Sequence, residues 1–119
     1  MIRKANRRRK ASGFEKDVYA LLKAERIPFV KEKSVGRCHV DIMIGDKMAV
    51  ELQGCHWHSC KKCFPKPSKW QKAALARDGR RFYFFTKLGF EVTQIWECEF
   101  RKNPDSVLTK LKSLYKRCK

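Results

Sequence analysis

Two short apolar runs near the middle of the chain, rich in β-branched residues and Met, predict a β-hairpin. The runs are residues 40–44 (VDIMI) and 48–52 (MAVEL), and Gly45, Asp46 and Lys47 between them are typical turn residues. A three-residue loop gives the better register, because it leaves one face of the hairpin wholly apolar. The pairs on that face are Ile44 with Met48, Ile42 with Val50 and Val40 with Leu52.

The other face of this hairpin carries Asp41 opposite Glu51, with Gln53 one step further along the strand. Two carboxylates that face each other across strands repel by about 0.2–1 kcal/mol. A divalent cation between them would remove the repulsion, and Mg²⁺ is the ion that prefers such oxygen ligands. The alternative is a solvated face on which nearby Lys and Arg side chains neutralise both acids. The hairpin leaves both interpretations open.

Helical periodicity predicts three helices around the hairpin. The first starts at Ser12, where Ser12 and Glu15 fit a capping box, which explains Glu15 without a catalytic role. The second covers residues 69–88 and ends at Gly89, and the third begins at Asn103 and Pro104. Apolar stripes on the first and third helices consist of Phe14, Val18, Leu21 and Leu22, and of Val107, Leu108, Leu111, Leu114 and Tyr115.

Two further segments, residues 29–33 and 91–97, are expected to be strands. Residues 34–37 read as a turn, and residues 55–69 as a loop that contains two prolines. The order is helix, strand, hairpin, loop, helix, strand, helix, which places a crossover helix between two strands. We therefore expect an α/β fold with helices packed on a mixed β-sheet.

Asp78 is a charged residue on the apolar face of the second predicted helix. It shares a stripe with four apolar residues, Trp70, Ala74, Phe82 and Phe85. A carboxylate on an apolar face needs a partner such as a His, an Arg or a metal-bound water, because an unpaired buried charge is costly. The alternative is a bend at Gly79 that brings Asp78 to water.

The charge balance points to a polyanionic partner. The chain has 119 residues, with 29 Lys and Arg against 12 Asp and Glu, and a formal net charge of +17. Nucleic acid is the commonest polyanion for such a chain, whereas no long apolar segment supports a membrane partner. Candidates for contacts with the DNA backbone are Arg7, Arg8, Arg9, Lys69, Lys72, Arg77, Arg80 and Arg81.

This length allows one folded domain, which we place at residues 12–119. Residues 1–11 are expected to be a flexible basic arm, since the first ten residues hold six Lys or Arg and no acid. A solubilising tail is the alternative for this arm. No apolar segment follows the charged start, so no secretory signal is recognised and we expect an intracellular location, in the cytoplasm, the nucleoid or a host nucleus.

Cysteine spacing predicts a structural zinc site. Cys55, Cys60 and Cys63 lie within nine residues, and two residues separate Cys60 from Cys63, which lets both thiolates reach one ion. Cys98 is the best fourth ligand, because it ends a strand expected to run beside the one that ends at Gln53. His56 and His58 are alternative ligands. The remaining alternative is reduced cysteines packed as small apolar side chains.

His58 is free for proton transfer if four thiolates hold the zinc ion. A surface histidine beside Trp57 is the equally weighted alternative. Trp57 and His56 lie next to Lys61 and Lys62 and also suit the stacking of unpaired bases.

The stretch VDIMIGDKMAVELQGCHWHSC, followed by RDGRRFYFFTKLGFEVTQIWECEF, resembles the very-short-patch repair endonucleases and the related EDxHD homing endonucleases. The match runs over residues 12–100. It implies a restriction-endonuclease-like fold of the PD-(D/E)xK superfamily, which is a mixed β-sheet flanked by helices, with a structural zinc loop. It also implies that the chain cuts or nicks DNA with Mg²⁺.

The resemblance further implies roles for individual residues. The first-helix acid falls on Glu15, the metal-binding Asp on Asp41, the catalytic His on His58 and the helical Asp on Asp78. The zinc ligands fall on Cys55, Cys60, Cys63 and Cys98. Glu51 and Gln53 stand where the superfamily has its ExK motif, which makes Glu51 a second candidate for Mg²⁺. His56 and Trp57 stand where the mismatch-repair members wedge two aromatic side chains into DNA.

We therefore expect a Mg²⁺-dependent DNA endonuclease that nicks its substrate. Asp41 would hold the metal ion together with Glu51 or Glu15, and His58, paired with Asp78, would act as general acid or base. One rival is a zinc-stapled DNA-binding module that has lost cleavage. The other is a structure-selective nuclease, such as a junction resolvase.

Overall fold

The computed structural model describes residues 13–36, 38–54, 60, 62–63 and 65–118. Helices and strands follow one another in the order that the sequence predicts, with one additional short helix. The elements are α1 (Gly13–Ala24), β2 (Val30–Val35), β3 (Cys38–Ile44), β4 (Met48–Gln53), α2 (Lys69–Lys87), β5 (Glu91–Trp96), α3 (Glu97–Lys102) and α4 (Pro104–Cys118). None of the described helices combines the length and apolar character that a membrane-spanning segment requires.

The strands form one mixed sheet in the order β2-β3-β4-β5. β2 and β3 are antiparallel, β3 and β4 are antiparallel, and β5 lies parallel to β4 after the crossover through α2. Ile44 pairs with Met48 and Ile42 with Val50, so the predicted register with a three-residue loop is confirmed. Gly45 lies in this loop with a φ of 66°, a conformation that glycine adopts without strain.

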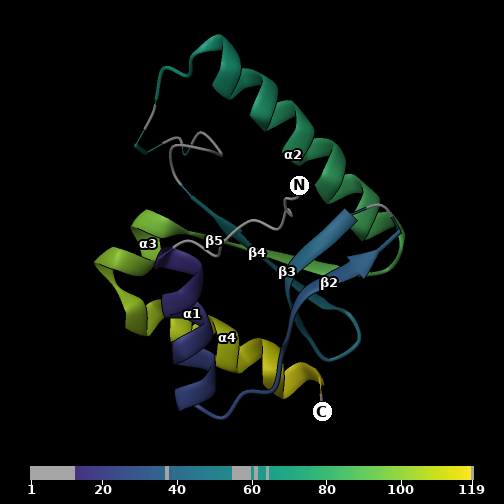
Figure 1. The fold of residues 1–119 in the computed structure, drawn as a ribbon, viewed down its shortest axis with the longest axis vertical. Coiled ribbons are helices and arrows are strands. Elements are labelled where there is room, and N and C mark those ends of the chain that lie inside the picture. The colour runs from purple at the N-terminus through teal and green to yellow at the C-terminus, as the bar shows by residue number, and fades with distance from the viewer. Residues whose placement is uncertain (1–12, 37, 55–59, 61, 64, 119) are drawn as a thin grey trace, which may run out of the picture.

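Helices cover both faces of the sheet, with α1, α3 and α4 below it and α2 above it in Figure 1. The larger core lies on the lower face and includes Ile42, Val50 and Ile95 of the sheet, packed against residues of the three lower helices. The helix residues of this core are Phe14, Val18, Tyr19, Leu22, Phe100, Val107, Leu111 and Leu114. The predicted apolar stripes of α1 and α4 thus form the main core, apart from Leu21, Leu108 and Tyr115, which are only partly buried.

A smaller core on the other face holds α2 against the sheet. It consists of Val40, Met43, Ala49 and Phe85, all at most 4% exposed. The alternating pattern placed Val40 on the same face as Ile42, and this detail is wrong. Val40 packs toward α2, because β3 is distorted next to Asp41, as described below.

α2 begins and ends where the sequence predicts. Ser68 accepts a hydrogen bond from the backbone of Gln71 and the Gln71 side chain accepts one from Ser68, which completes a capping box. At the other end Gly89 has a φ of 95°, and Phe90 donates to the carbonyl of Phe85 in a Schellman motif. Helical structure continues through Gly79, so α2 is not broken there.

The predicted apolar stripe of α2 is only half correct. Ala74 and Phe85 are buried, whereas Trp70 is 45% and Phe82 44% exposed. Here the sheet carries an open cleft under the middle of α2, as described below.

Three boundaries differ from the expectation. β2 continues to Val35, and Gly36 with a φ of 59° follows it directly, so the predicted turn at residues 34–37 is shorter. The strand predicted at residues 91–97 ends at Trp96, where α3 begins. Acidic residues in the first turn of α3 and basic residues in its last turn favour this short helix electrostatically.

Candidate active site

The sheet is interrupted on both sides of Asp41. β2 pairs with β3 at Lys31↔Ile42 and again at Lys33↔Val40, and the pair between these is missing. Glu32, which would form it, has a φ of 49°, in the left-handed region that non-glycine residues seldom adopt. The β3–β4 ladder runs only from Ile44 to Ile42. Asp41 therefore leaves the regular sheet, and its backbone needs other partners.

The Glu51 carboxylate supplies a partner for the Asp41 backbone, and the Asp41 carboxylate does the same for the backbone of Leu52. The backbone N–H of Asp41 donates to Glu51 Oε2 over 3.4 Å, and the backbone N–H of Leu52 donates to Asp41 Oδ2 over 2.8 Å. Glu51 Oε1 accepts a hydrogen bond from Arg81 Nε of α2 over 2.5 Å. Asp41 and Glu51 thus lie together, as the hairpin register predicts, with one guanidinium from α2 beside them.

Burial raises the pKa of Asp41 from 3.8 to about 7. The nearby charge of Glu51, and to a smaller extent that of Glu15, add to this increase, while the Leu52 hydrogen bond and Arg81 oppose it. A carboxylate surrounded in this way gains from an added positive charge. Glu51 is only 5% exposed and Asp41 is partly buried, so the two acids do not lie on a fully solvated face, whereas the neutralising arginine of that alternative is present as Arg81.

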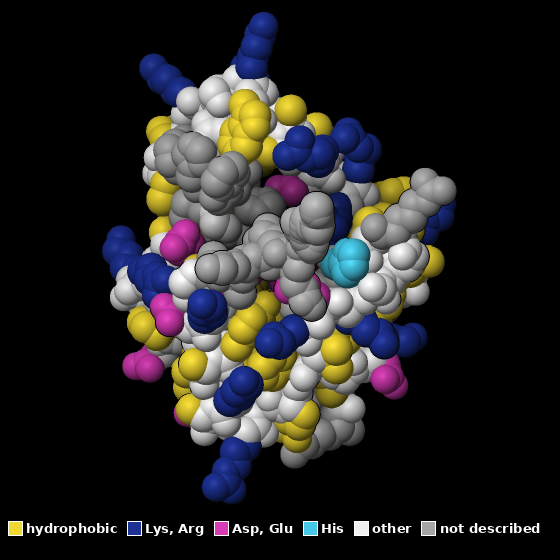
Figure 2. Space-filling view, in the orientation of Figure 1, with side chains coloured by type: hydrophobic (Ala, Val, Ile, Leu, Met, Phe, Trp, Pro, Cys, Tyr) yellow, Lys and Arg dark blue, Asp and Glu magenta, His cyan; other side chains and the backbone are white. Residues whose placement is uncertain are grey.

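Glu15 and Asp78 lie in the same cleft as Asp41 and Glu51. The cleft has a volume of about 1130 Å³ and is bounded by α1, the sheet, α2 and α3. Glu15, in the first turn of α1, is 8% exposed, and Asp78 is half-buried on the side of α2 that faces the cleft. In Figure 2 acidic side chains are visible in the middle of this face, with Lys and Arg side chains around them. The four acidic candidates are therefore brought together by the fold.

The donor set fits a hard divalent cation. Asp41, Glu51 and Glu15 offer carboxylate oxygens from two strands and a helix, and oxygen ligands are those that Mg²⁺ prefers. Asp41 Oδ2 accepts the Leu52 hydrogen bond, whereas Oδ1 accepts none from the described residues. Asp41 is thus the best-placed ligand.

Basic residues of α2 form one wall of the cleft. Arg77, Arg80 and Arg81 line it, and their contacts with a nucleic-acid backbone stay a prediction. Lys69 and Lys72 are exposed near the start of the same helix and do not line the cleft. Arg7, Arg8 and Arg9 of the expected arm lie outside the described residues, as does the capping residue Ser12.

Several cleft residues were not among the candidates from the sequence, including Cys38, Glu97 and Arg101. Cys38 comes from β3, while Glu97 and Arg101 come from α3. Arg101 also pairs with Asp17 of α1 over 2.5 Å, which ties α3 to α1 at the rim of the cleft. Residues 97–102 are first acidic and then basic, a charge pattern that favours a helix. This pattern was the sequence signal available for α3, and hence for Glu97 and Arg101.

A cluster of three cysteines lies beside the cleft. The sulfurs of Cys60, Cys63 and Cys98 all lie within 4.8 Å of one another, and Cys60 Sγ is 3.7 Å from Cys98 Sγ. Sulfurs about 2.3 Å from a tetrahedral zinc ion lie about 3.8 Å apart, so this spacing suits a shared zinc ion. Cys98 lies in the first turn of α3 and not at the end of a strand, but the predicted grouping of these three residues is present.

The remaining predicted residues, Cys55, His56, Trp57 and His58, lie outside the described part of the chain. They connect Gly54, which lines the cleft, with Cys60 of the cysteine cluster. Along the chain, this segment therefore connects the acidic cleft with the cysteine cluster. The pairing of His58 with Asp78 stays a prediction.

No family model matches the sequence, and no curated protein matches it at a significant level. Among solved structures, the chain is similar to the catalytic domain of the homing endonuclease I-Bth0305I, with a TM-score of 0.68 and 19% sequence identity. The alignment covers 91% of this chain and 98% of that domain. The expected mixed sheet flanked by helices is therefore confirmed, and it is the fold of a homing endonuclease catalytic domain.

Proposed function

We propose that this protein is a Mg²⁺-dependent DNA endonuclease that nicks its substrate. The observation that carries the proposal is the partly buried Asp41, held by Leu52 and close to Glu15 and Glu51 in a cleft walled by arginines. The formal net charge of +17 and the likeness to a homing endonuclease domain support DNA as the substrate.

In this proposal Asp41 holds the metal ion, and Glu15 and Glu51 are the candidate further ligands. A bound Mg²⁺ ion stabilises negative charge on the phosphate and lowers the pKa of a coordinated water. His58 acts as the general acid or base, and Asp78 orients its imidazole. Arg77 and Arg80 bind backbone phosphates, together with Lys69, Lys72 and the basic arm. Trp57 and His56 stack on bases.

A zinc ion held by Cys60, Cys63, Cys98 and Cys55 is proposed to be structural. It fixes the loop between β4 and α2, which has few apolar residues with which to form a core. Because His58 lies between Cys55 and Cys60, the same ion holds that histidine near the cleft.

A supercoiled-plasmid assay with Mg²⁺ tests the proposal. Wild type should convert plasmid to the nicked form, and Asp41→Ala and His58→Ala should each be at least about 100-fold slower. Equal conversion by all three proteins would exclude the proposed site. DNA binding by wild type without any conversion would indicate a binding module.

The preferred substrate is identified by comparing the cleavage of perfectly paired, mismatched and branched duplexes. A strong preference for four-way junctions would replace the nicking enzyme with a junction-selective one. Nicked and linear plasmid products separate single-strand from double-strand cutting in the same experiment.

A further inference from the structure

We infer that Arg81 is a catalytic residue that acts on the scissile phosphate, and that Glu51 positions Arg81 and does not bind the metal ion. The inference rests on the proposed function. It separates Arg81 from the other basic residues of α2, whose contribution is to DNA affinity.

Arg81 is held from two sides. Its Nε donates to Glu51 Oε1 over 2.5 Å, and its guanidinium carbon lies 5.1 Å from the centre of the Phe85 ring. Phe85 is fully buried and anchors α2 on the sheet one turn further along the helix. The guanidinium is therefore fixed in the cleft before any substrate arrives.

The orientation of Arg81 leaves its phosphate-binding atoms available. Nε is engaged with Glu51, and the two terminal nitrogens have no hydrogen-bond partner among the described residues. The side chain is 33% exposed and lines the cleft with Asp41. Two nitrogens of a planar guanidinium suit two oxygens of one phosphate group.

Glu51 has the contacts of an anchor. Its side chain is 7% exposed, Oε1 accepts from Arg81, and Oε2 accepts from the backbone of Asp41. Asp41, in contrast, has one oxygen that accepts no hydrogen bond from the described residues. Asp41 is thus the carboxylate best placed for the ion, and Glu51 fixes both Arg81 and the backbone of Asp41.

A donor fixed in this way affects the rate more than the affinity. It needs no reorganisation when charge develops on the phosphate in the transition state. Loss of one such preorganised donor typically lowers the rate by about 100- to 1,000-fold. Loss of an ordinary contact with a DNA phosphate instead weakens DNA binding and reduces the salt dependence of that binding.

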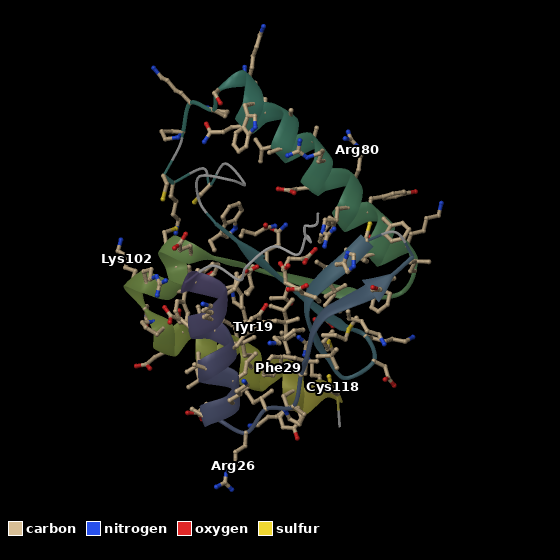
Figure 3. All side chains as sticks on the ribbon, viewed as in Figure 1. Tyr19, Arg26, Phe29, Arg80, Lys102 and Cys118 are labelled. Carbon is tan, nitrogen blue, oxygen red and sulfur yellow. The ribbon has the colours of Figure 1, made fainter. Side chains whose placement is uncertain are left out.

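Single-turnover cleavage at saturating DNA, together with DNA affinity, tests the role of Arg81. Arg81→Gln should lower the rate constant by about 100-fold or more and change the affinity by less than about tenfold. Arg81→Lys should recover part of the rate, because it keeps the charge without the planar fork. The matched control is Arg26→Gln, which removes the same charge at an exposed site at the far end of the molecule from Arg80 of α2 (Figure 3).

Mn²⁺ binding, measured by electron paramagnetic resonance without cleavage, tests the role of Glu51. Glu51→Gln should keep Mn²⁺ affinity within about threefold of wild type, whereas Asp41→Asn should lose most of it. In cleavage, the Glu51→Gln/Arg81→Gln double variant should be no slower than Arg81→Gln, because the two residues act as a unit.

Two results would overturn the inference alone: an active wild type with Arg81→Gln as fast as Arg26→Gln, or loss of Mn²⁺ binding in Glu51→Gln. A wild type that does not cleave DNA would instead overturn the proposed function, and the inference with it. The two failures are therefore distinguishable.

Discussion

The backbone N–H of Leu52 donates a 2.8 Å hydrogen bond to Asp41 Oδ2, so the strand next to Asp41 holds its carboxylate in the cleft. That bond lowers the pKa of Asp41, but burial and the charge of Glu51 outweigh it and raise the pKa to about 7. The same surroundings that prepare the site for a cation therefore make an ionised Asp41 unfavourable in the metal-free protein.

Asp41→Asn should stabilise the metal-free protein at pH 8 while abolishing cleavage. The folded-state pKa of about 7 lies above the ordinary value of 3.8, so the contribution of Asp41 to stability is greatest at low pH and declines as the pH rises through this window. Asparagine keeps an oxygen for Leu52 and carries no charge. Melting temperatures of zinc-loaded protein without Mg²⁺ should show a gain of several degrees at pH 8 and a clearly smaller gain at pH 5.

The matched control for this change is Asp46→Asn, which removes a carboxylate from the exposed β3–β4 turn. It should leave the melting temperature nearly the same at both pH values. A loss of stability in Asp41→Asn at pH 8 would contradict the assigned direction of the pKa shift.

Stabilisation by Mg²⁺ should increase with pH. A proton and the metal ion compete for Asp41, whose pKa of about 7 places this competition near neutrality. The increase in melting temperature on adding Mg²⁺ should be small at pH 5.5 and larger at pH 8. Asp41→Asn should remove this pH dependence, and a wild-type response that is equal at both pH values would argue against Asp41 as the ligand.

Purified protein should contain about one zinc ion per chain, as a single four-ligand site requires. Cys98→Ser should lose the ion and melt at a clearly lower temperature, because the cysteine cluster joins α3 to the loop before α2. Elemental analysis and thermal melting give both readouts. Cys118→Ser is the control. The Cys118 thiol donates a hydrogen bond to the carbonyl of Ile44 outside the cluster, so this variant should retain zinc.

Asp78→Asn should slow cleavage while DNA affinity and melting temperature stay close to wild type. The proposed role of Asp78 is to orient His58, and loss of an orienting partner typically costs about 10- to 100-fold. In a double variant with His58→Ala, Asp78→Asn should cause no further loss of cleavage rate, because the two residues act on one proton transfer. Additive losses in the double variant would separate Asp78 from His58.

Much of the fold could be predicted because local patterns and tertiary packing agree. The capping residues of α2, the Gly89 end of that helix and the register of Ile42 with Val50 all follow from short-range rules. The meeting of Asp41 with Glu51 follows from the same register. The grouping of Cys98 with Cys60 needed one long-range assumption, that β5 lies beside β4, and that assumption is confirmed.

The rest depends on departures from those rules. Strict alternation misplaced Val40, because it assumes a regular strand, and β3 is distorted where Glu32 has a positive φ. Arg81 resembles its basic neighbours in sequence, and only the structure distinguishes it by its contact with Glu51. Both exceptions adjoin Asp41, where the proposed chemistry takes place.

α2 is 19 residues long, yet Gln71, Ala74 and Phe85 are its only buried residues. So few buried contacts give a helix a low free energy of local opening, even when its caps are well formed. In native-state hydrogen exchange the amides near the middle of α2 should exchange sooner than those of β4 and α4. The attachment of α2 to the sheet therefore depends on few side chains, and Phe85 together with the Arg81–Glu51 ion pair holds the part of the helix that lines the cleft.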